Sequence, residues 1–319
     1  MGKVSSKTVL KQEKNGSKFK RTLRHIQRDR QLLIIFLPCA LFYAIFRYGP
    51  MFGLVMSFQD YGIFLGYFKS PFVGLKHFIK FFNSPDFLLL FKNTFLLGLY
   101  TLLWTFPFPI IFSIFLNEIR NAKFKKTIQT LSFLPSFLSV VIVSSMVIDF
   151  LSPSRGIINT IIQALGFEAK YFIVEPEWFR TIFIASEIWS TMGYSAIIYL
   201  AAIAGVDPSL YEAARVDGCG RLRSIWYITL PSILPTIATM FILKSGSMFS
   251  IGYEKVLLLY TPTTYKVADV FSTYVYRKGL LESNYSYAAA VGLFESFVAL
   301  SLLLISNKMS KKLTDQSLW

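Results

Sequence analysis

Long apolar runs constrain this chain more than any other feature. A helix needs about 20 mainly apolar residues to cross the hydrocarbon core of a bilayer. We predict six such spans, at Leu32–Phe58, Thr94–Leu116, Thr127–Leu151, Phe179–Ile203, Ser232–Tyr253 and Tyr285–Ser306. Only 16% of the residues are charged, whereas a soluble domain carries about 25%. The sequence therefore predicts an all-α membrane protein.

Two of the predicted spans contain residues that disturb a helix. Pro107 and Pro109 should kink the second span, which neighbouring helices can tolerate by satisfying the freed carbonyls. The fifth span is interrupted by Lys244, Gly246 and Gly252. It is the least regular of the six.

The basic residues cluster beside the apolar runs and predict the orientation. They gather in the tail before Leu32, in the loop after the second span and in the tail after 307. Cytoplasmic loops carry an excess of Lys and Arg, so both termini should be cytoplasmic. We divide the chain into a basic tail (1–31), a six-helix domain (32–307) and a second tail (308–319). The net charge of +15 is thus assigned to topology and argues against nucleic-acid binding. Contact of the first tail with anionic lipids remains an alternative role.

Several other classes of protein find no support in the sequence. His25 and His77 have no companions at metal-ligand spacing, and Cys39 and Cys219 form no disulfide or metal framework. The first span is too long for a signal peptide and no small-residue cleavage site follows it. No paired carboxylates or nucleophile–base set stands out within the spans. The sequence does not predict an enzyme.

A short polar helix is predicted between the fourth and fifth spans, within the cytoplasmic loop 204–231. Asp207 is a good N-cap and Pro208 suits the first turn. Gly218 suits the left-handed position after a helix. A second helix should start at Arg221 and stop near Pro231. An ordinary amphipathic helix at the membrane surface would have the same features.

This loop resembles a known signature. Glu212-Ala213-Ala214, then Gly218, then Ile228-x-Leu230-Pro231 is similar to the EAA loop of binding-protein-dependent ABC importer permeases. The stretches "FRYGPMFGLVMSFQDYGIF", "SPFVGLKHFIKFF" and "FLPSFLSVVIVSSMV" resemble the carbohydrate permeases of the polysaccharide or lipo-oligosaccharide type. Cys219 departs from the common alanine, but it is also small.

The resemblance implies a fold and a function. The fold would be the six-helix type I importer domain in a bacterial plasma membrane, with the short helix as a coupling helix. Its docking residues on an ATPase would be Glu212, Ala213, Ala214, Arg215, Asp217, Gly218, Leu230 and Pro231. The implied partners are two ATPase subunits, a second and different permease, an extracytoplasmic binding protein and an oligosaccharide. ATP and Mg would be held by the ATPases, because this chain has no G-x-x-x-x-G-K-[ST] loop.

Polar and aromatic residues inside the spans are candidates for the substrate path. Ionisable groups within a membrane should face the path or pair with each other, and sugars are bound by aromatic faces and polar groups. The candidates are Glu187, Trp189, Tyr194, Lys244, Ser247, Met248 and Glu295. The two aromatic residues have ordinary helix packing as an equal alternative. A lysine in the path would suit an acidic oligosaccharide.

An ion-coupled secondary sugar transporter is the alternative function. Such a transporter would need inverted repeats and midplane carboxylates. We find no repeat, and the short cytoplasmic helix would have no evident role.

Overall fold

The computed structural model describes residues 30–314. Residues up to Val55 belong to one compact unit and residues from Met56 onward to a second. The first unit contains α2 (Arg30–Tyr43), the π-helical turn η1 (Ala44–Tyr48) and most of the 3-10 helix η2 (Gly49–Phe58). The predicted tail 1–31 lies almost wholly outside the described residues.

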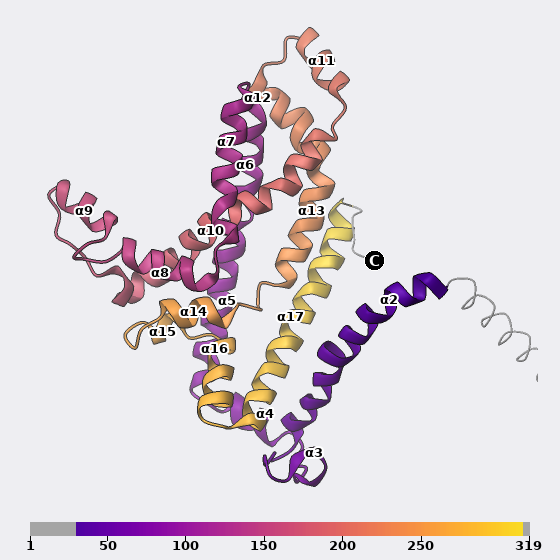
Figure 1. Ribbon diagram of the computed structural model, residues 1–319, viewed down its shortest axis with the longest axis vertical. Coiled ribbons are helices and arrows are strands. Elements are labelled where there is room, and N and C mark those ends of the chain that lie inside the picture. The colour runs from indigo at the N-terminus through magenta and orange to yellow at the C-terminus, as the bar shows by residue number, and fades with distance from the viewer. Residues whose placement is uncertain (1–29, 315–319) are drawn as a thin grey trace, which may run out of the picture. The chain divides into compact units, whose positions relative to one another are not determined.

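The second unit is built from helices, and its described residues form no strand beyond one isolated bridge between Gln59 and Phe72. Its helices are α3 (Gly66–Lys69), α4 (Lys76–Phe82), α5 (Asp86–Thr105), α6 (Pro107–Glu118), α7 (Ala122–Phe133), η3 (Leu134–Phe137), α8 (Val140–Phe150), α9 (Ile157–Ala164), η4 (Phe172–Val174), α10 (Pro176–Ala204), α11 (Pro208–Val216), α12 (Arg221–Ser224), η5 (Ile225–Thr229), α13 (Leu230–Gly246), α14 (Tyr253–Leu259), α15 (Tyr265–Ala268), α16 (Phe271–Tyr276), η6 (Arg277–Leu281) and α17 (Tyr285–Thr314). Figure 1 shows their arrangement.

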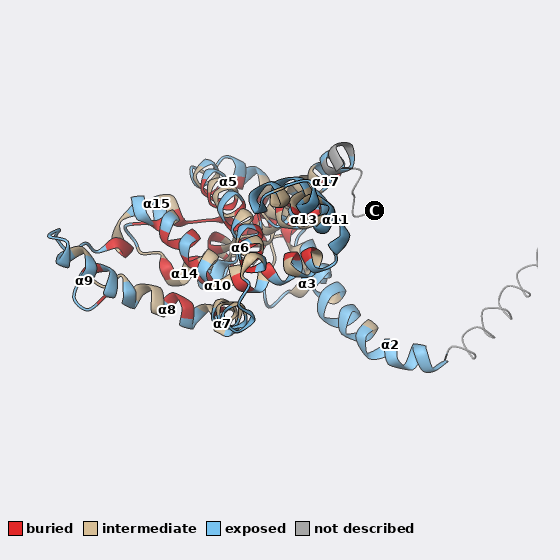
Figure 2. Cartoon of the chain, turned by 90° about the horizontal axis from the view of Figure 1, so that it is seen from above, coloured by how far each residue is buried: buried red, intermediate tan, exposed pale blue. Residues whose placement is uncertain are grey.

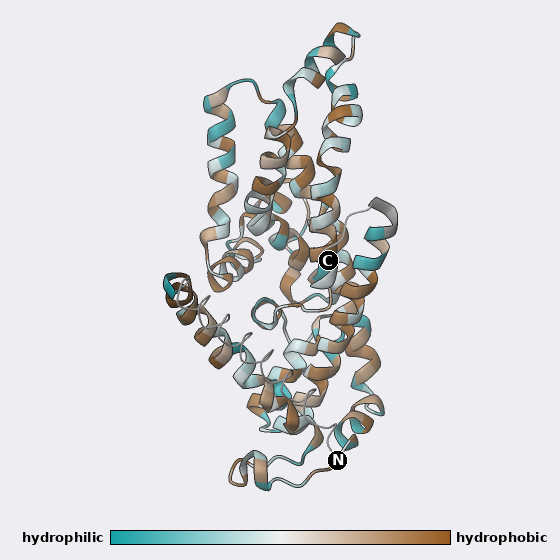
Figure 3. Ribbon diagram, turned by 90° about the vertical axis from the view of Figure 1, so that its right-hand side faces the viewer, coloured by the Kyte–Doolittle hydropathy of each residue, from teal (hydrophilic) through white to brown (hydrophobic). Residues whose placement is uncertain are grey.

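The predicted membrane helices are present. Four helices of the described chain are long and apolar enough to cross a bilayer by themselves: Arg30–Phe58, Asp86–Glu118, Arg221–Gly246 and Tyr285–Met309. Two bent pairs bring the number to six, namely Ala122–Phe137 with Val140–Phe150, and Pro176–Ala204 with Pro208–Val216. Apolar residues are spread along the lengths of the helices (Figure 3).

Several predicted boundaries are wrong. The third span, predicted as one helix over Thr127–Leu151, bends by 106° between Phe137 and Val140. Pro135 and the new N-cap at Ser139, whose hydroxyl accepts a hydrogen bond from the Ile142 N–H, start a separate helix there. The second span begins at Asp86 and is interrupted at Phe106, directly before the two prolines. α17 continues to Thr314, past the predicted end of the sixth span at Ser306.

The fifth span also differs from its prediction at both ends. It stops at Gly246 instead of Tyr253, and residues 247–252 contain no regular helix before α14 begins. Ser247 and Ser250 lie in this turn, where their polar groups need not pack inside a helix. The predicted stop at Pro231 is absent, because α12, η5 and α13 run on as one helix.

α10 lies at the centre of the second unit. It packs against α5, α6, α7, η3 and α13, and buried residues gather around it (Figure 2). One core cluster joins Leu97 of α5 with Phe183 of α10 and Val256 of α14. A second joins Phe81, Phe249 and Phe271 in a set of edge-to-face and stacked rings. The first cluster fixes α14 beside α10, where the cavity lies.

Candidate functional site

A cavity of about 370 Å³ lies between α5, α10, α13 and α14. Four ionisable residues line it: Glu187, Lys244, Glu254 and Lys255. Ser247, Ser250 and Thr101 add hydroxyl groups, and Phe183 adds an aromatic ring. The lining thus combines charge, hydroxyls and apolar surface in one cavity.

A close ion pair crosses this cavity. The Lys255 ammonium of α14 lies 2.7 Å from a Glu187 carboxylate oxygen on α10. Its side chain is buried, at 8% exposure against 28% for Glu187, and the ammonium stands 4.9 Å from the centre of the Phe183 ring. A buried charge requires such partners, because desolvation without them is costly.

Lys244 is placed differently. It lines the same cavity from the last turn of α13, and its ammonium has no ion pair with any residue that the structure describes. The buried Thr101 hydroxyl likewise has no hydrogen-bond partner among residues 30–314. Lys244, which is only partly buried, is therefore the cation of this wall that can meet a ligand.

A glycine allows the non-helical segment to reach this depth. A Cβ atom on Gly98 of α5 would lie 2.1 Å from the Met248 carbonyl oxygen, which no side chain could accept. Gly98 therefore lets the Met248 backbone, within the segment 247–252, pack directly on α5. Irregular backbone at membrane depth is tolerated where it lines a cavity.

Two further cavities adjoin the first. One, of about 410 Å³, shares Glu187 and Lys255 with it and extends past Ser190 and Tyr194. The other, of about 280 Å³, shares Lys244 and Ser247 and is also lined by Tyr194 and Tyr199. The shared residues make the three cavities neighbours along α10.

The structure brings together five of the seven predicted path residues. Glu187, Tyr194, Lys244, Ser247 and Met248 line the cavities. Trp189 lies on another side of α10, in an apolar groove. Glu295 of α17 lines none of the three cavities. Trp189 lies on a different side of α10 from Glu187 because two residues correspond to a rotation of about 200° around the helix.

Sequence reasoning missed Lys255, Glu254 and Thr101. The first two follow the predicted fifth span and read as loop residues. A signal was present: "GYEKVLLLY" sets two opposite charges before an apolar run, which fits a short helix that packs against the bundle.

The loop between α10 and α12 carries the predicted short helix α11. Asp207 caps α11, its carboxylate accepting a hydrogen bond from the Ser209 N–H at 2.9 Å. This bond holds the pKa of Asp207 below its ordinary value. At the other end Gly218 has φ +74°, with the Cys219 N–H bonded to the Ala214 carbonyl and the Gly218 N–H to the Arg215 carbonyl. This is the Schellman arrangement.

α11 presents a free surface. None of its residues is buried, and Glu212, Ala213, Arg215 and Asp217 are exposed together with Val216 at 88% exposure. Figure 1 shows α11 at the tip of the loop between α10 and α12. The loop is tied to the bundle by the Tyr211 hydroxyl, 3.0 Å from the Thr229 hydroxyl.

A wide turn joins this loop to the fifth span. The Leu230 N–H bonds to the Ile225 carbonyl, five residues back, in the π-helical turn η5. Pro231 lacks an N–H and its ring would clash in a regular α-turn, so the wider turn gives the ring room. From Arg221 to Lys244 the helix is continuous, about 35 Å at 1.5 Å per residue.

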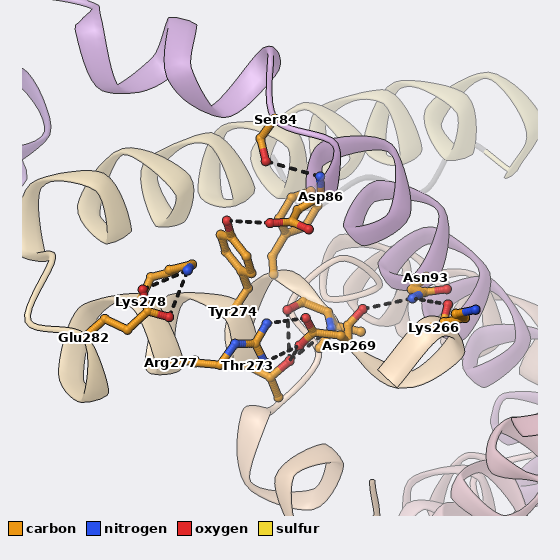
Figure 4. Close-up of polar contacts among 12 residues, drawn as sticks. Ser84, Asp86, Asn93, Lys266, Asp269, Thr273, Tyr274, Arg277, Lys278 and Glu282 are labelled. Atoms are coloured by element: carbon orange, nitrogen blue, oxygen red, sulfur yellow. Dashed lines mark hydrogen bonds and ion pairs between the residues drawn. The ribbon is translucent and has the colours of Figure 1, made fainter. Parts of the chain in front are cut away.

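A polar network holds α16 and the loops around it (Figure 4). Arg277 pairs with Asp269 at 2.6 Å, and the Asn93 amide donates to the carbonyls of Lys266 and Asp269. The Tyr274 hydroxyl donates to Asp86 at 3.0 Å, and burial raises the pKa of Tyr274. These contacts join α5 to the segment that follows α14.

Comparison with known proteins agrees with this geometry. Residues 93–313 match the family described as "Binding-protein-dependent transport system inner membrane component". The polygalacturonan/rhamnogalacturonan transport system permease protein YteP of Bacillus subtilis is 44% identical, over 98% of this chain and 96% of its own length. Protein LplB of the same organism is 41% identical over 92% of each chain.

Two solved structures have the same fold as this chain. A chain from the crystal structure of a bacterial ABC transporter "involved in the import of the acidic polysaccharide alginate" matches with a TM-score of 0.86 and 42% identity. The match covers 92% of this chain and 99% of that chain. A second structure of a bacterial alginate ABC transporter, in complex with "alginate pentasaccharide-bound periplasmic protein", also gives a TM-score of 0.86.

Proposed function

Because the chain belongs to the family of binding-protein-dependent transport system inner membrane components, we propose that it is a permease subunit that moves an acidic oligosaccharide across the membrane. The substrate would be delivered by an extracytoplasmic binding protein. ATP would be hydrolysed on two separate ATPase subunits, and a second, different permease would complete the path. Both termini would lie in the cytoplasm.

The observation that carries the proposal is the continuous helix Arg221–Gly246. It starts at the exposed loop and ends with Lys244 at the cavity. A partner that moves α11 would therefore move a wall of the cavity, which is how a rigid element converts a distant event into a local change. A secondary transporter would have no use for this connection.

The acidic substrate is supported by the lining of the cavity. Glu187 and Lys255 satisfy each other at 2.7 Å, which leaves Lys244 as the cation without an ion pair on the described cavity wall. Ser247 and Ser250 line the same cavity with hydroxyl groups. Carboxylate recognition by an ammonium together with hydroxyl recognition fits a uronate-containing sugar. The relatives named for alginate and for polygalacturonan transport favour the same substrate class.

Co-purification tests the coupling role. In Glu212→Gln combined with Gly218→Ala, we expect the ATPase subunits to be lost from the purified complex. The matched control is Glu282→Gln, a carboxylate paired with Lys278 outside this loop, which should retain them. Retention of the ATPases by the double variant would exclude α11 as the docking element, whereas absence of ATPases from the purified wild-type protein would favour the secondary transporter.

Substrate-stimulated ATPase activity of the reconstituted importer tests the substrate class. Wild-type protein should respond to uronate oligosaccharides, and Lys244→Gln should lose about tenfold in preference for them over neutral ones, about 1.4 kcal/mol. The control is Glu254→Gln, because Glu254 also lines the cavity and forms no ion pair with a described residue. This variant should not reduce the preference for uronate oligosaccharides. An unchanged preference in Lys244→Gln would refute the role of this lysine.

A further inference from the structure

An apolar groove lies on the side of α10 turned away from the charged cavity. It has a volume of about 570 Å³ and is bounded by α8, α9, η4 and the first half of α10. None of its lining residues is charged. Phe150, Ile158, Trp178 and Trp189 contribute large apolar side chains that are 38–43% exposed. This concave surface is therefore open and without a covering side chain from the described chain.

α9 forms one wall of the groove and is amphipathic. Ile157, Ile161 and Leu165 are 52–70% exposed along one side, and Figure 2 shows α9 largely exposed. A short helix with an exposed apolar side is typical of an element that lies in the plane of a membrane surface. Such a helix would be poorly solvated in water.

One side chain makes this wall rigid. The Asn159 amide donates to the carbonyls of Leu151, Ser152 and Lys170 at 2.9–3.2 Å, and its oxygen accepts from the Lys170 N–H at 2.8 Å. These hydrogen bonds hold α9 in a fixed position against the end of α8 and the segment at Lys170.

The length of the groove matches one leaflet. Trp178 and Trp189 lie at its two ends on α10 and are separated by about 16 Å at 1.5 Å per residue. Half of the roughly 30 Å hydrocarbon core is about 15 Å. Trp178 lies close to the start of α10 at Pro176, where tryptophan is favoured at the membrane interface.

The lining favours a lipid chain over a protein helix. Helices that pack inside membranes meet through small residues, whereas this groove has mainly aromatic and branched aliphatic walls, with Ala185 and Ser186 on its floor. The neighbouring cations are already matched, Arg155 by Asp149 at 2.9 Å and Lys170 by Glu175 at 2.8 Å. These pairings leave neither of the two cations free to select an anionic headgroup.

We propose that the groove between α8, α9 and α10 holds one acyl chain of a phospholipid from the outer leaflet, with α9 lying flat in the membrane surface. The site is separate from the sugar path. The assignment to the outer leaflet rests on the orientation given under the proposed function. The binding of an acyl chain in the groove does not depend on that orientation.

Tryptophan quenching by lipid tests the proposal. The assembled importer, with Trp189 retained and the other tryptophans of this chain and its partners replaced by Phe, is placed in nanodiscs of phosphatidylcholine brominated on the acyl chains. Strong quenching of Trp189 fluorescence is expected. Absence of quenching would mean that the second permease or another protein covers the groove, and it would overturn the proposal.

A groove-filling variant gives the second measurement. Ala185→Phe should cause loss of phospholipid that otherwise survives washing in detergent, measured by mass spectrometry of the purified complex. Ala201→Phe, the same change at an exposed site elsewhere on α10, should retain it. Equal retention in the two variants would refute the site. Retention should also be the same for phosphatidylcholine and phosphatidylglycerol, and a requirement for the anionic lipid would contradict the acyl-chain assignment.

Discussion

Replacing Lys255 by methionine removes the ammonium that lies 2.7 Å from Glu187 and keeps most of the side-chain volume. Glu187 then remains as a carboxylate in a largely apolar wall. Removing one partner of a fully buried ion pair costs about 3–5 kcal/mol. Here Glu187 keeps 28% exposure and shares its cavity with Lys244, so we expect about 2–3 kcal/mol, below that range.

Thermal unfolding of the purified complex measures this cost. At about 2 °C per kcal/mol for a chain of this size, Lys255→Met should lower the Tm by about 4–6 °C. The double variant Glu187→Gln, Lys255→Met removes both charges and should recover most of the loss. The control is Lys266→Met, an exposed lysine on α15, which should change stability by less than about 0.5 kcal/mol. A double variant no more stable than Lys255→Met would show that packing, and not the unpaired carboxylate, causes the loss.

Two further predictions concern single backbone positions. Gly98→Ala would place a Cβ atom 2.1 Å from the Met248 carbonyl, so transport and Tm should both fall. Gly292→Ala, whose Cβ would make only an ordinary contact at 3.9 Å, should leave both unchanged, and equal behaviour of the two would contradict the seating of residues 247–252 on α5. The N-cap of α11 should depend on pH with a definite sign. Because the Ser209 N–H lowers the pKa of Asp207, the cap stabilises α11 at pH values above the ordinary carboxyl pKa and is lost as the pH falls through the lowered value. Hydrogen exchange of α11 amides against pH would measure this, and Asp207→Asn should remove the dependence.

The membrane fold was predictable because apolar length and basic flanks are local properties. The six spans, the cap at Asp207 and the left-handed Gly218 all follow from residues that act on their immediate neighbours. The resemblance around Glu212 could be recognised from the spacing of a few residue types in the sequence.

Tertiary features were not predictable in the same way. The end of α13 at Gly246 depends on contact between Gly98 and Met248, which are far apart in the chain. The pairing of Glu187 with Lys255 depends on where α14 folds back. Trp189 was assigned to the path by residue type alone, whereas its side of α10 is fixed by packing against α8 and η4. The turn η5 replaced a predicted stop because a proline near the start of a span can be accommodated by one wider turn.

The four hydrogen bonds of Asn159 have a chemical consequence over time. Hydrolysis of this amide to a carboxylate would turn a donor to three carbonyl oxygens into an acceptor facing them. The segment from Leu151 to Lys170 would lose the side chain that joins those carbonyls, and apolar packing such as that of Ile162 would have to hold α9 in place. Ageing of the protein by loss of a single ammonia molecule would then loosen one wall of the apolar groove, whereas the charged cavity, which shares no lining residue with it, would be unchanged.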